Sequence, residues 1–182
     1  DLRSLDSDPD LLILQEAVAG TPTSVGQVSD NFHSFAEGFS VGEWETGVMT
    51  TSTAEPLTEC RLEAIEPWLG TRKATLVTEY ALTDSDETLL VVNIHGINFT
   101  LGLSALQEQL RQVHAIIEQH TGPVLVAGDF NTWSGRRAAM LQRLVDNLDL
   151  VALEYDVDHR TRFFGQILDH IYVRGLETVH AS

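Results

Sequence analysis

The segment that most constrains the fold is residues 123–131, Pro-Val-Leu-Val-Ala-Gly-Asp-Phe-Asn. The apolar run after its proline predicts a short strand that is buried on both faces. Gly128 then permits backbone angles that other residues avoid, so that Asp129 and Asn131 follow the strand at its carboxyl end. In α/β proteins a ligand crevice forms at the carboxyl ends of strands, and carboxylate and amide oxygens suit hard cations. The segment therefore predicts an α/β fold with a polar site at this edge of a sheet.

Two further apolar runs also end in polar side chains. Residues 11–14 predict a second buried strand that leads into Glu16, and residues 89–95 predict a third strand that ends at His95. Asn98 follows three residues later. Taken singly, Glu16 could equally begin a solvated loop, and a lone histidine is usually a hydrogen-bonded structural residue. Together these side chains indicate that several strands deliver polar groups to one site.

Other strands are predicted around these. Residues 47–52 and 73–82 have strand composition, and the short polar turn after the second of them predicts an antiparallel hairpin with the strand that ends at His95. Residues 17–44 are rich in Gly, Ser, Thr and Pro, which predicts a long surface connection with some strand in it. The last strand is predicted at 167–173. Its adjacent Asp169 and His170 should point to opposite faces of the sheet.

Two helices are predicted to cover the sheet. Apolar residues at spacings of three and four predict a helix over 103–117, with Ser104 opening a capping box. Ser134 can cap a second helix. Arg136 and Arg137 then lie in the first turn of that helix, where positive charge is unfavourable to the helix dipole. They are either ordinary surface arginines, the commoner case, or a sign of an anionic partner nearby.

Length and charge narrow the class of protein. The chain has 182 residues, which fits one domain, and no apolar run in it is long enough to cross a bilayer. The formal net charge of −16 disfavours binding to long nucleic acid, because an acidic surface repels polyanions. The single cysteine, Cys60, excludes an intrachain disulfide and a thiolate zinc site. It favours a reducing compartment, and we expect a cytoplasmic location.

Five motifs together give the chain a resemblance to the endonuclease/exonuclease/phosphatase superfamily. Within it, the chain most resembles a bacterial member of unassigned substrate. The motifs occur in the superfamily's order: Gln15-Glu16, Gly47-Val48-Met49, Asn93-Ile94-His95, Gly128-Asp129-Phe130-Asn131 and Leu168-Asp169-His170-Ile171. The resemblance implies a single domain over residues 1–182 with a four-layer α-β-β-α sandwich, in which two mixed sheets lie between helices. It also implies that the chain lacks the superfamily's first strand and its last segment, so that the domain is truncated at both ends.

The resemblance assigns the metal chemistry to three residues. Glu16 matches the superfamily's metal-binding glutamate. Asp129 matches the carboxylate that activates or orients the attacking water, and we also count it as a metal ligand; Asn131 lies beside it. Oxygen ligands and retained water favour Mg²⁺, for which Mn²⁺ can substitute.

The resemblance also assigns contacts with the substrate. His95 matches a residue that contacts the scissile phosphate, and Asn98 matches a further phosphate contact. Asp169 matches an aspartate that orients a catalytic histidine in a later Ser-Asp-His segment, which this sequence does not contain. His170 is not expected to replace that histidine, because alternation turns it away from Asp169.

We therefore expect a divalent-metal-dependent phosphoesterase that hydrolyses a phosphodiester or phosphomonoester with metal-activated water. The substrate class is open between a small molecule, a lipid headgroup and a nucleic acid, with long nucleic acid disfavoured by charge. The alternative is a noncatalytic binding module that retains the fold and part of the site.

Overall fold

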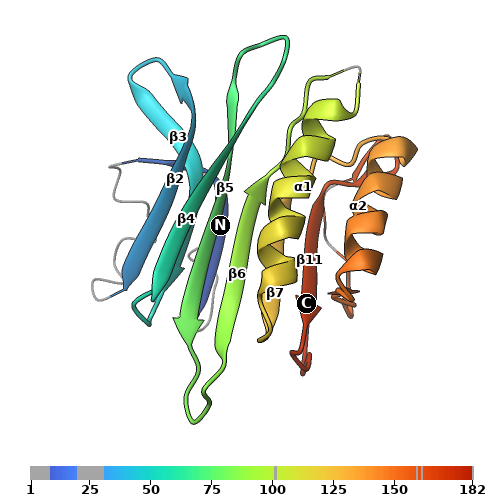
Figure 1. Ribbon diagram of the computed structural model, residues 1–182. Helices are drawn as coiled ribbons and strands as arrows, with labels where there is room; N and C mark the ends of the chain where they lie inside the picture. Colours follow the sequence, from blue (N-terminus) through green and yellow to red (C-terminus); the bar gives the residue numbers. More distant parts are fainter. Residues whose placement is uncertain (1–8, 20–30, 101, 159, 161, 182) are drawn as a thin grey trace.

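The computed structural model describes residues 9–19, 31–100, 102–158, 160 and 162–181. Over these residues the chain forms two packed β-sheets, a short hairpin and two helices (Figure 1).

The smaller sheet has three antiparallel strands in the order β1-β3-β2. They are β1 (Leu11–Val18), β2 (Phe32–Val41) and β3 (Trp44–Ser52). The strand expected within the connection over 17–44 is β2, which with a tight turn fills the second half of that segment. The buried positions of β2 are Ser34, Ala36 and Gly38. Because these residues are small or polar, the sequence of β2 does not show the alternation of large apolar residues that usually marks a strand. Small side chains let this strand lie close against β5.

The larger sheet has six strands in the order β4-β5-β6-β7-β11-β8. They are β4 (Thr58–Ile65), β5 (Arg72–Ala81), β6 (Thr88–His95), β7 (Val124–Asp129), β11 (Asp169–Arg174) and β8 (Val151–Ala152). The strands β6 and β7 run parallel, and the neighbouring pairs are antiparallel, including the predicted β5–β6 hairpin. A separate two-stranded hairpin joins β9 (Arg162–Phe163) to β10 (Gln166–Ile167) just before β11.

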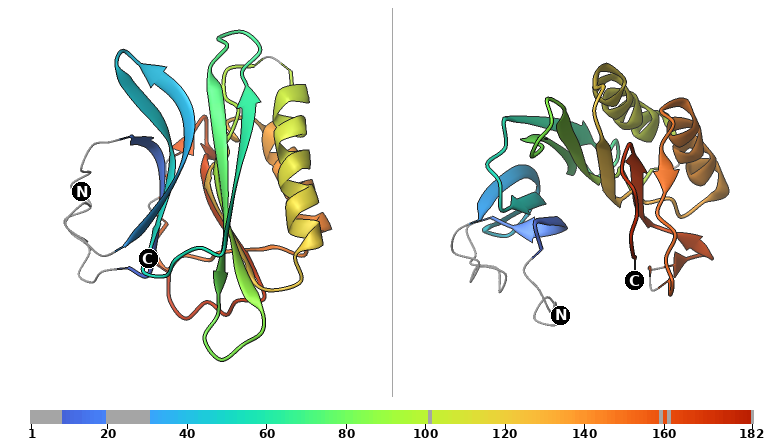
Figure 2. Two further views of the ribbon diagram at one scale, coloured as in Figure 1. Left: turned by 60° about the vertical axis from the view of Figure 1, so that its left-hand side comes forward. Right: turned by 90° about the horizontal axis from the view of Figure 1, so that it is seen from below.

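The layers follow from the two faces of the larger sheet (Figure 2). One face packs against α1 (Ser104–Gln119) and α2 (Gly135–Asn147), and the main hydrophobic core lies between them. The other face receives the smaller sheet over a second cluster, formed by Ala36, Val48, Ala74 and Leu76. The predicted α/β sandwich of two sheets is confirmed. In detail, the six-stranded sheet is the mixed one and the three-stranded sheet is antiparallel, and both described helices lie on the same side.

The helix α1 buries the face that the apolar spacing predicted, with Leu106, Leu110, Val113 and Ile117 in the core. The capping box at Ser104 was wrong. The helix begins one residue earlier, with Leu103 at the N-cap and its carbonyl accepting a hydrogen bond from the Gln107 amide at 2.8 Å. Neither described helix is long and apolar enough to span a membrane.

Candidate active site

Strand register brings three of the predicted side chains into one row. The parallel pairing of β6 with β7 places His95 opposite Asp129, and the antiparallel pairing of β11 with β7 places Asp169 opposite the same residue. Residues directly opposite one another on neighbouring strands project from the same face of a sheet. His95, Asp129 and Asp169 therefore lie side by side at one edge of the larger sheet, on the face that the smaller sheet covers.

Two glycines allow the strand ends to approach this closely. Gly128 has a φ of 149°, and a Cβ atom there would overlap the carbonyl oxygen of Ile94 on β6. A Cβ atom at Gly96 would lie 2.8 Å from backbone atoms of Phe130. The Gly96 amide donates to the Asp129 carbonyl at 2.6 Å, which extends the pairing of the two strands past their ends. Any larger residue at either position would separate the strands.

Glu16 reaches the row from the opposite sheet. The register of β1 against β3 shifts between Leu14 and Ala17, and Glu16 adopts a left-handed backbone with a φ of 55°. Its carboxylate Oε1 lies 3.9 Å from His95 Nε2, and Asp129 Oδ2 lies 4.0 Å from the same nitrogen. Its side chain is 65% exposed. The irregularity in β1 therefore directs a solvent-accessible carboxylate at the row.

The neighbouring Gln15 fixes how the sheets face each other. Its side-chain amide donates to Asn93 Oδ1 at 2.8 Å, and Asn93 Nδ2 donates to the carbonyls of Leu14 (3.1 Å) and Met49 (2.9 Å). Asn93 is fully buried, so these bonds satisfy a polar side chain that would otherwise be costly between two sheets. The Gln-Glu pair thus has a physical basis, since Gln15 hydrogen-bonds β1 to β6 and Glu16 directs its carboxylate toward His95.

Asp129 is held in place by the residue that follows it in the motif. The Asn131 amide donates to Asp129 Oδ1 at 2.8 Å, and Asn131 Nδ2 donates to the Gly96 carbonyl at 2.9 Å. Burial raises the pKa of Asp129 to about 6, helped by the charges of Asp169 and Glu16 and opposed by the Asn131 amide and Lys73. Strained φ values recur at functional sites, and Asn131, like Glu16, has a positive one, 51°.

A buried lysine, which the sequence did not reveal, contacts His95. Lys73 Nζ lies 2.7 Å from His95 Nε2, and both residues are buried. Because an ammonium group only donates hydrogen bonds, Nε2 accepts in this arrangement and the imidazole is neutral. Burial, and then the charge of Lys73, lowers the pKa of His95 to about 4. The pKa of Lys73 is lowered by burial and raised in part by Glu66, Glu16 and Asp129.

A second residue that the sequence did not reveal, Glu66, shapes the loop after β6. Its carboxylate accepts the amides of Asn98 at 2.8 Å and Phe99 at 3.3 Å, and the Thr71 hydroxyl also donates to it. Burial raises its pKa, but these hydrogen bonds and Lys73 outweigh burial, so that the pKa is lowered overall. Glu66 directly follows β4, yet only the tertiary fold brings it to this loop.

Arg137 corrects a prediction. It is not a surface arginine: it is 1% exposed. Its Nε donates to the Asn131 carbonyl at 2.6 Å, a second guanidinium nitrogen donates to the Ile97 carbonyl, and the group lies 5.2 Å from the Trp133 ring. Burial lowers its pKa. Arg137 is buried because the two loops at the site present carbonyl groups that need donors.

Gln109 of α1, like Arg137, is a buried polar side chain that hydrogen-bonds the backbone of a loop at the site. Its side chain accepts the Ile97 amide at 2.9 Å and donates to the His95 carbonyl at 3.0 Å. Asn98 then joins the two loops, because its Oδ1 accepts Trp133 Nε1 at 3.0 Å. The loops that hold the site are therefore fastened by buried polar side chains.

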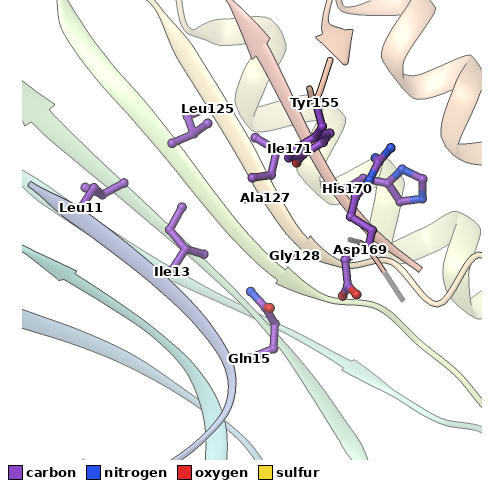
Figure 3. Close-up of a pocket in the computed structure, with 11 residues that line it drawn as sticks. Leu11, Ile13, Gln15, Leu125, Ala127, Gly128, Tyr155, Asp169, His170 and Ile171 are labelled. Atoms are coloured by element: carbon purple, nitrogen blue, oxygen red, sulfur yellow. The ribbon is translucent and has the colours of Figure 1, made fainter. Parts of the chain in front are cut away.

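Asp169 and His170 point to opposite faces, as alternation predicted. Figure 3 shows the Asp169 carboxylate directed away from the imidazole of His170. His170 instead contacts Thr132 Oγ1 at 2.9 Å and stacks on Tyr172 at 5.6 Å between ring centroids. Asp169 lines a cavity of about 430 Å³ together with Gln15, and its pKa is raised by burial and lowered in part by Arg160.

The oxygen donors of the site determine which metal ion it could hold. Within the described ranges no group of three or more His, Cys, Asp or Glu side chains has the arrangement of a metal cluster. Glu16 and Asp129 nevertheless each place a carboxylate oxygen within about 4 Å of His95 Nε2, so the two carboxylates lie near one another. Mg²⁺ commonly binds one or two carboxylates and keeps several waters, so this set suits a hard, partly hydrated cation. It does not suit a closed structural zinc site.

A family profile and curated relatives both match this chain over nearly its whole length. The sequence profile of the Endonuclease/Exonuclease/phosphatase family matches residues 2–182. A UPF0294 protein of Yersinia pseudotuberculosis is 40% identical over 183 residues, which cover 100% of this chain and 70% of that protein. A UPF0294 protein of Yersinia enterocolitica is 38% identical over the same shares.

Solved structures share the fold at low sequence identity. The human Nocturnin catalytic domain with bound sulfate has a TM-score of 0.65 and 16% identity, covering 91% of this chain and 69% of that one. An endonuclease/exonuclease/phosphatase family protein from Bacteroides thetaiotaomicron has a TM-score of 0.66 and 14% identity over the same shares. The 3′ phosphatase NExo from Neisseria, bound to product DNA hairpin, has a TM-score of 0.59 and 18% identity, covering 92% and 77%.

Proposed function

Because the chain belongs to the endonuclease/exonuclease/phosphatase family, we propose that it is a divalent-metal-dependent phosphoesterase that hydrolyses a phosphodiester or phosphomonoester. The observation that carries the proposal is the row of His95, Asp129 and Asp169 with the Glu16 carboxylate facing it from the other sheet. This arrangement offers three carboxylates and a neutral imidazole at one accessible edge.

Glu16 and Asp129 would hold the cation, Mg²⁺ or in its place Mn²⁺. When bound, such an ion stabilises negative charge on phosphate oxygens and lowers the pKa of water. The mutual repulsion that helps to raise the pKa of Asp129 supports this assignment, because a cation would relieve it.

Asp129 is proposed to take the proton from the attacking water. In the metal-free chain its pKa of about 6 leaves it ionised at neutral pH, which is the form that can accept a proton. The Asn131 amide holds one oxygen of Asp129, which leaves Oδ2 for the water. Asn131 is therefore proposed as a positioning residue.

Lys73 and His95 are proposed to act as a pair on the phosphoryl group. The ammonium of Lys73 supplies positive charge in a desolvated site, where charge stabilisation is strongest. His95 accepts a hydrogen bond from that ammonium. Once the ammonium turns to the substrate, His95 is proposed to donate to the phosphate in the tautomer that carries its proton on Nε2. The Asn98 Nδ2 group, whose partner oxygen is already bonded to Trp133, is proposed to donate to another phosphate oxygen. Asp169 is proposed to orient a histidine, and His170 does not fill that role because it lies on the opposite face.

The proposed substrate is a phosphoester borne by a small molecule, a lipid headgroup or a nucleic acid. The net charge of −16 weighs against long nucleic acid. Cys60 is a free, exposed thiol, which supports a proposed cytoplasmic location.

The test is hydrolysis of bis-p-nitrophenyl phosphate and p-nitrophenyl phosphate by the longest natural chain that contains residues 1–182. We expect turnover that requires Mg²⁺, stops with EDTA and is lost in Asp129→Ala. The preferred ester then shows whether the enzyme is a diesterase or a monoesterase. Hydrolysis that Asp129→Ala leaves unchanged would refute the assignment of the base.

A second candidate is a noncatalytic binding module. It is favoured by one observation, the small number of metal donors that the described residues bring together. Metal binding by calorimetry without turnover of either ester would support the module, and turnover would exclude it.

A further inference from the structure

Exposed apolar side chains gather at the edge of the sandwich that holds the proposed active site. We call this set the apolar rim. It consists of Val41, Trp44, Trp68, Leu69, Phe99, Phe163 and Phe164, each at least 51% exposed. Single exposed apolar residues are ordinary, but several around one site usually mark an interaction surface.

The rim comes from four separate turns. They are the β2–β3 turn, the β4–β5 turn, the loop from β6 to α1 and the β9–β10 turn. Figure 1 shows the first three at the same end of the sheets, the end toward which β6 runs. The fourth precedes β11, whose first residue, Asp169, pairs with Asp129. The apolar side chains thus lie in or beside turns at the end of the sandwich that carries the proposed site.

Hydrogen bonds and ring contacts tie these turns to the site. Phe39, near the β2–β3 turn, lies edge-on to His95 at 6.4 Å and 5.1 Å from Lys73 Nζ. Glu66, at the start of the β4–β5 turn, accepts the amides of Asn98 and Phe99. Three of the four parts of the rim therefore have a fixed position relative to the proposed catalytic groups.

An aromatic cavity connects the rim to the site. Its volume is about 360 Å³, and Phe99, Trp133, Phe163 and Phe164 supply most of its lining. Asn98 and Asn131 also line it, and Asn131 positions the proposed base. A group held in this cavity would lie beside a phosphate in the site. The arrangement suits a substrate that is apolar next to its phosphate.

Charge distinguishes between the partners that aromatic side chains could serve. Aromatic platforms for single-stranded nucleic acid are combined with a positively charged groove. Here the chain carries a net charge of −16, and exposed Glu43 and Glu45 flank Trp44 in the β2–β3 turn. The same charge repels an anionic membrane. A zwitterionic lipid surface remains, and tryptophan side chains favour the interface between lipid and water.

We propose that the apolar rim docks the protein onto a zwitterionic lipid bilayer, and that the aromatic cavity receives the apolar part of a lipid phosphoester. The catalytic half rests on the proposed function: water bonds to phosphorus, one phosphorus–oxygen ester bond breaks, and the leaving oxygen takes a proton. The docking half does not depend on catalysis.

The test measures association with phosphatidylcholine vesicles by co-sedimentation in EDTA, where no metal-dependent hydrolysis occurs. The rim variants are Leu69→Ser and the double variant Trp68→Ser/Leu69→Ser. The matched control is Leu57→Ser. Leu57 is 58% exposed, against 59% for Leu69, but it lies just before the first residue of β4, whereas the rim residues Trp68 and Leu69 follow its last residue. Each rim substitution should weaken vesicle binding at least about tenfold. The control should bind as the unaltered protein does.

Hydrolysis of bis-p-nitrophenyl phosphate, which has no lipid portion, is measured in parallel and should be unchanged in all three variants. No vesicle association, or association that the rim variants and Leu57→Ser alter equally, overturns the inference. Binding to a fluorescent single-stranded oligonucleotide in place of vesicles also overturns it. Vesicle binding without ester hydrolysis would sustain the docking surface and count against the proposed function, so the two failures are distinguishable.

Discussion

Replacing Asp129 with asparagine should stabilise the metal-free chain at neutral pH while abolishing hydrolysis. Burial and neighbouring carboxylates disfavour the ionised form of Asp129. Asparagine carries no charge, and its side-chain oxygen can still accept the Asn131 amide that bonds to Oδ1. The substitution therefore removes the electrostatic cost and keeps the local hydrogen bond.

The magnitude follows from the pKa. Folding raises the pKa of Asp129 from 3.8 to about 6. Below the lower value both states are protonated and the cost is zero. Between the two values the unfolded chain loses the proton first, so stability falls as pH rises, and above about 6 the loss is complete. At about 1.4 kcal/mol per pH unit, the full loss is roughly 3 kcal/mol.

Urea unfolding in EDTA at pH 4 and pH 8 measures this difference. The gain in free energy of unfolding from Asp129→Asn should be roughly 2.5 kcal/mol larger at pH 8 than at pH 4, because about 0.5 kcal/mol is already present at pH 4, just above the unfolded pKa of 3.8. Asp86→Asn, which removes an exposed carboxylate from the β5–β6 turn, is the control and should show no such difference. An equal effect of Asp129→Asn at both pH values would refute the reasoning.

Three further substitutions test the site's construction. Lys73→Met should lower kcat on the order of a hundredfold with an unchanged circular dichroism spectrum, and an unaltered rate would exclude the lysine from the site. Gln109→Leu should destabilise the chain by roughly 2–4 kcal/mol in urea, because it leaves the Ile97 amide and the His95 carbonyl unpaired. Gly128→Ala should cost more than about 3 kcal/mol by thermal unfolding, whereas Gly102→Ala, with open space around it, should stay within about 0.5 kcal/mol.

The elements that carry the site could be predicted from local pattern. Apolar runs that end in Glu16, His95 and Asp129 marked the strands, and alternation placed Asp169 and His170 on opposite faces. Each of these signals lies within one short stretch of chain. The structure adds that register aligns three of the strand ends, which no single stretch could show.

The errors lie where tertiary contacts decide. Arg137 has a surface pattern in the sequence, yet it is buried because two loop carbonyls require a donor. Lys73 and Glu66 also could not be found, since each becomes a site residue through partners more than twenty positions away. The strand β2 was hidden because its buried face is made of small residues. In each case burial depends on a neighbour that local sequence does not specify.

The most direct test of the central claim is the hydrolysis rate of bis-p-nitrophenyl phosphate as a function of Mg²⁺ concentration at pH 8, for the unaltered protein and for Asp129→Asn. The account predicts a saturable dependence on Mg²⁺ in the unaltered protein and a rate at least about a hundredfold lower in the variant. Turnover that needs no divalent cation, or that Asp129→Asn retains, would contradict it.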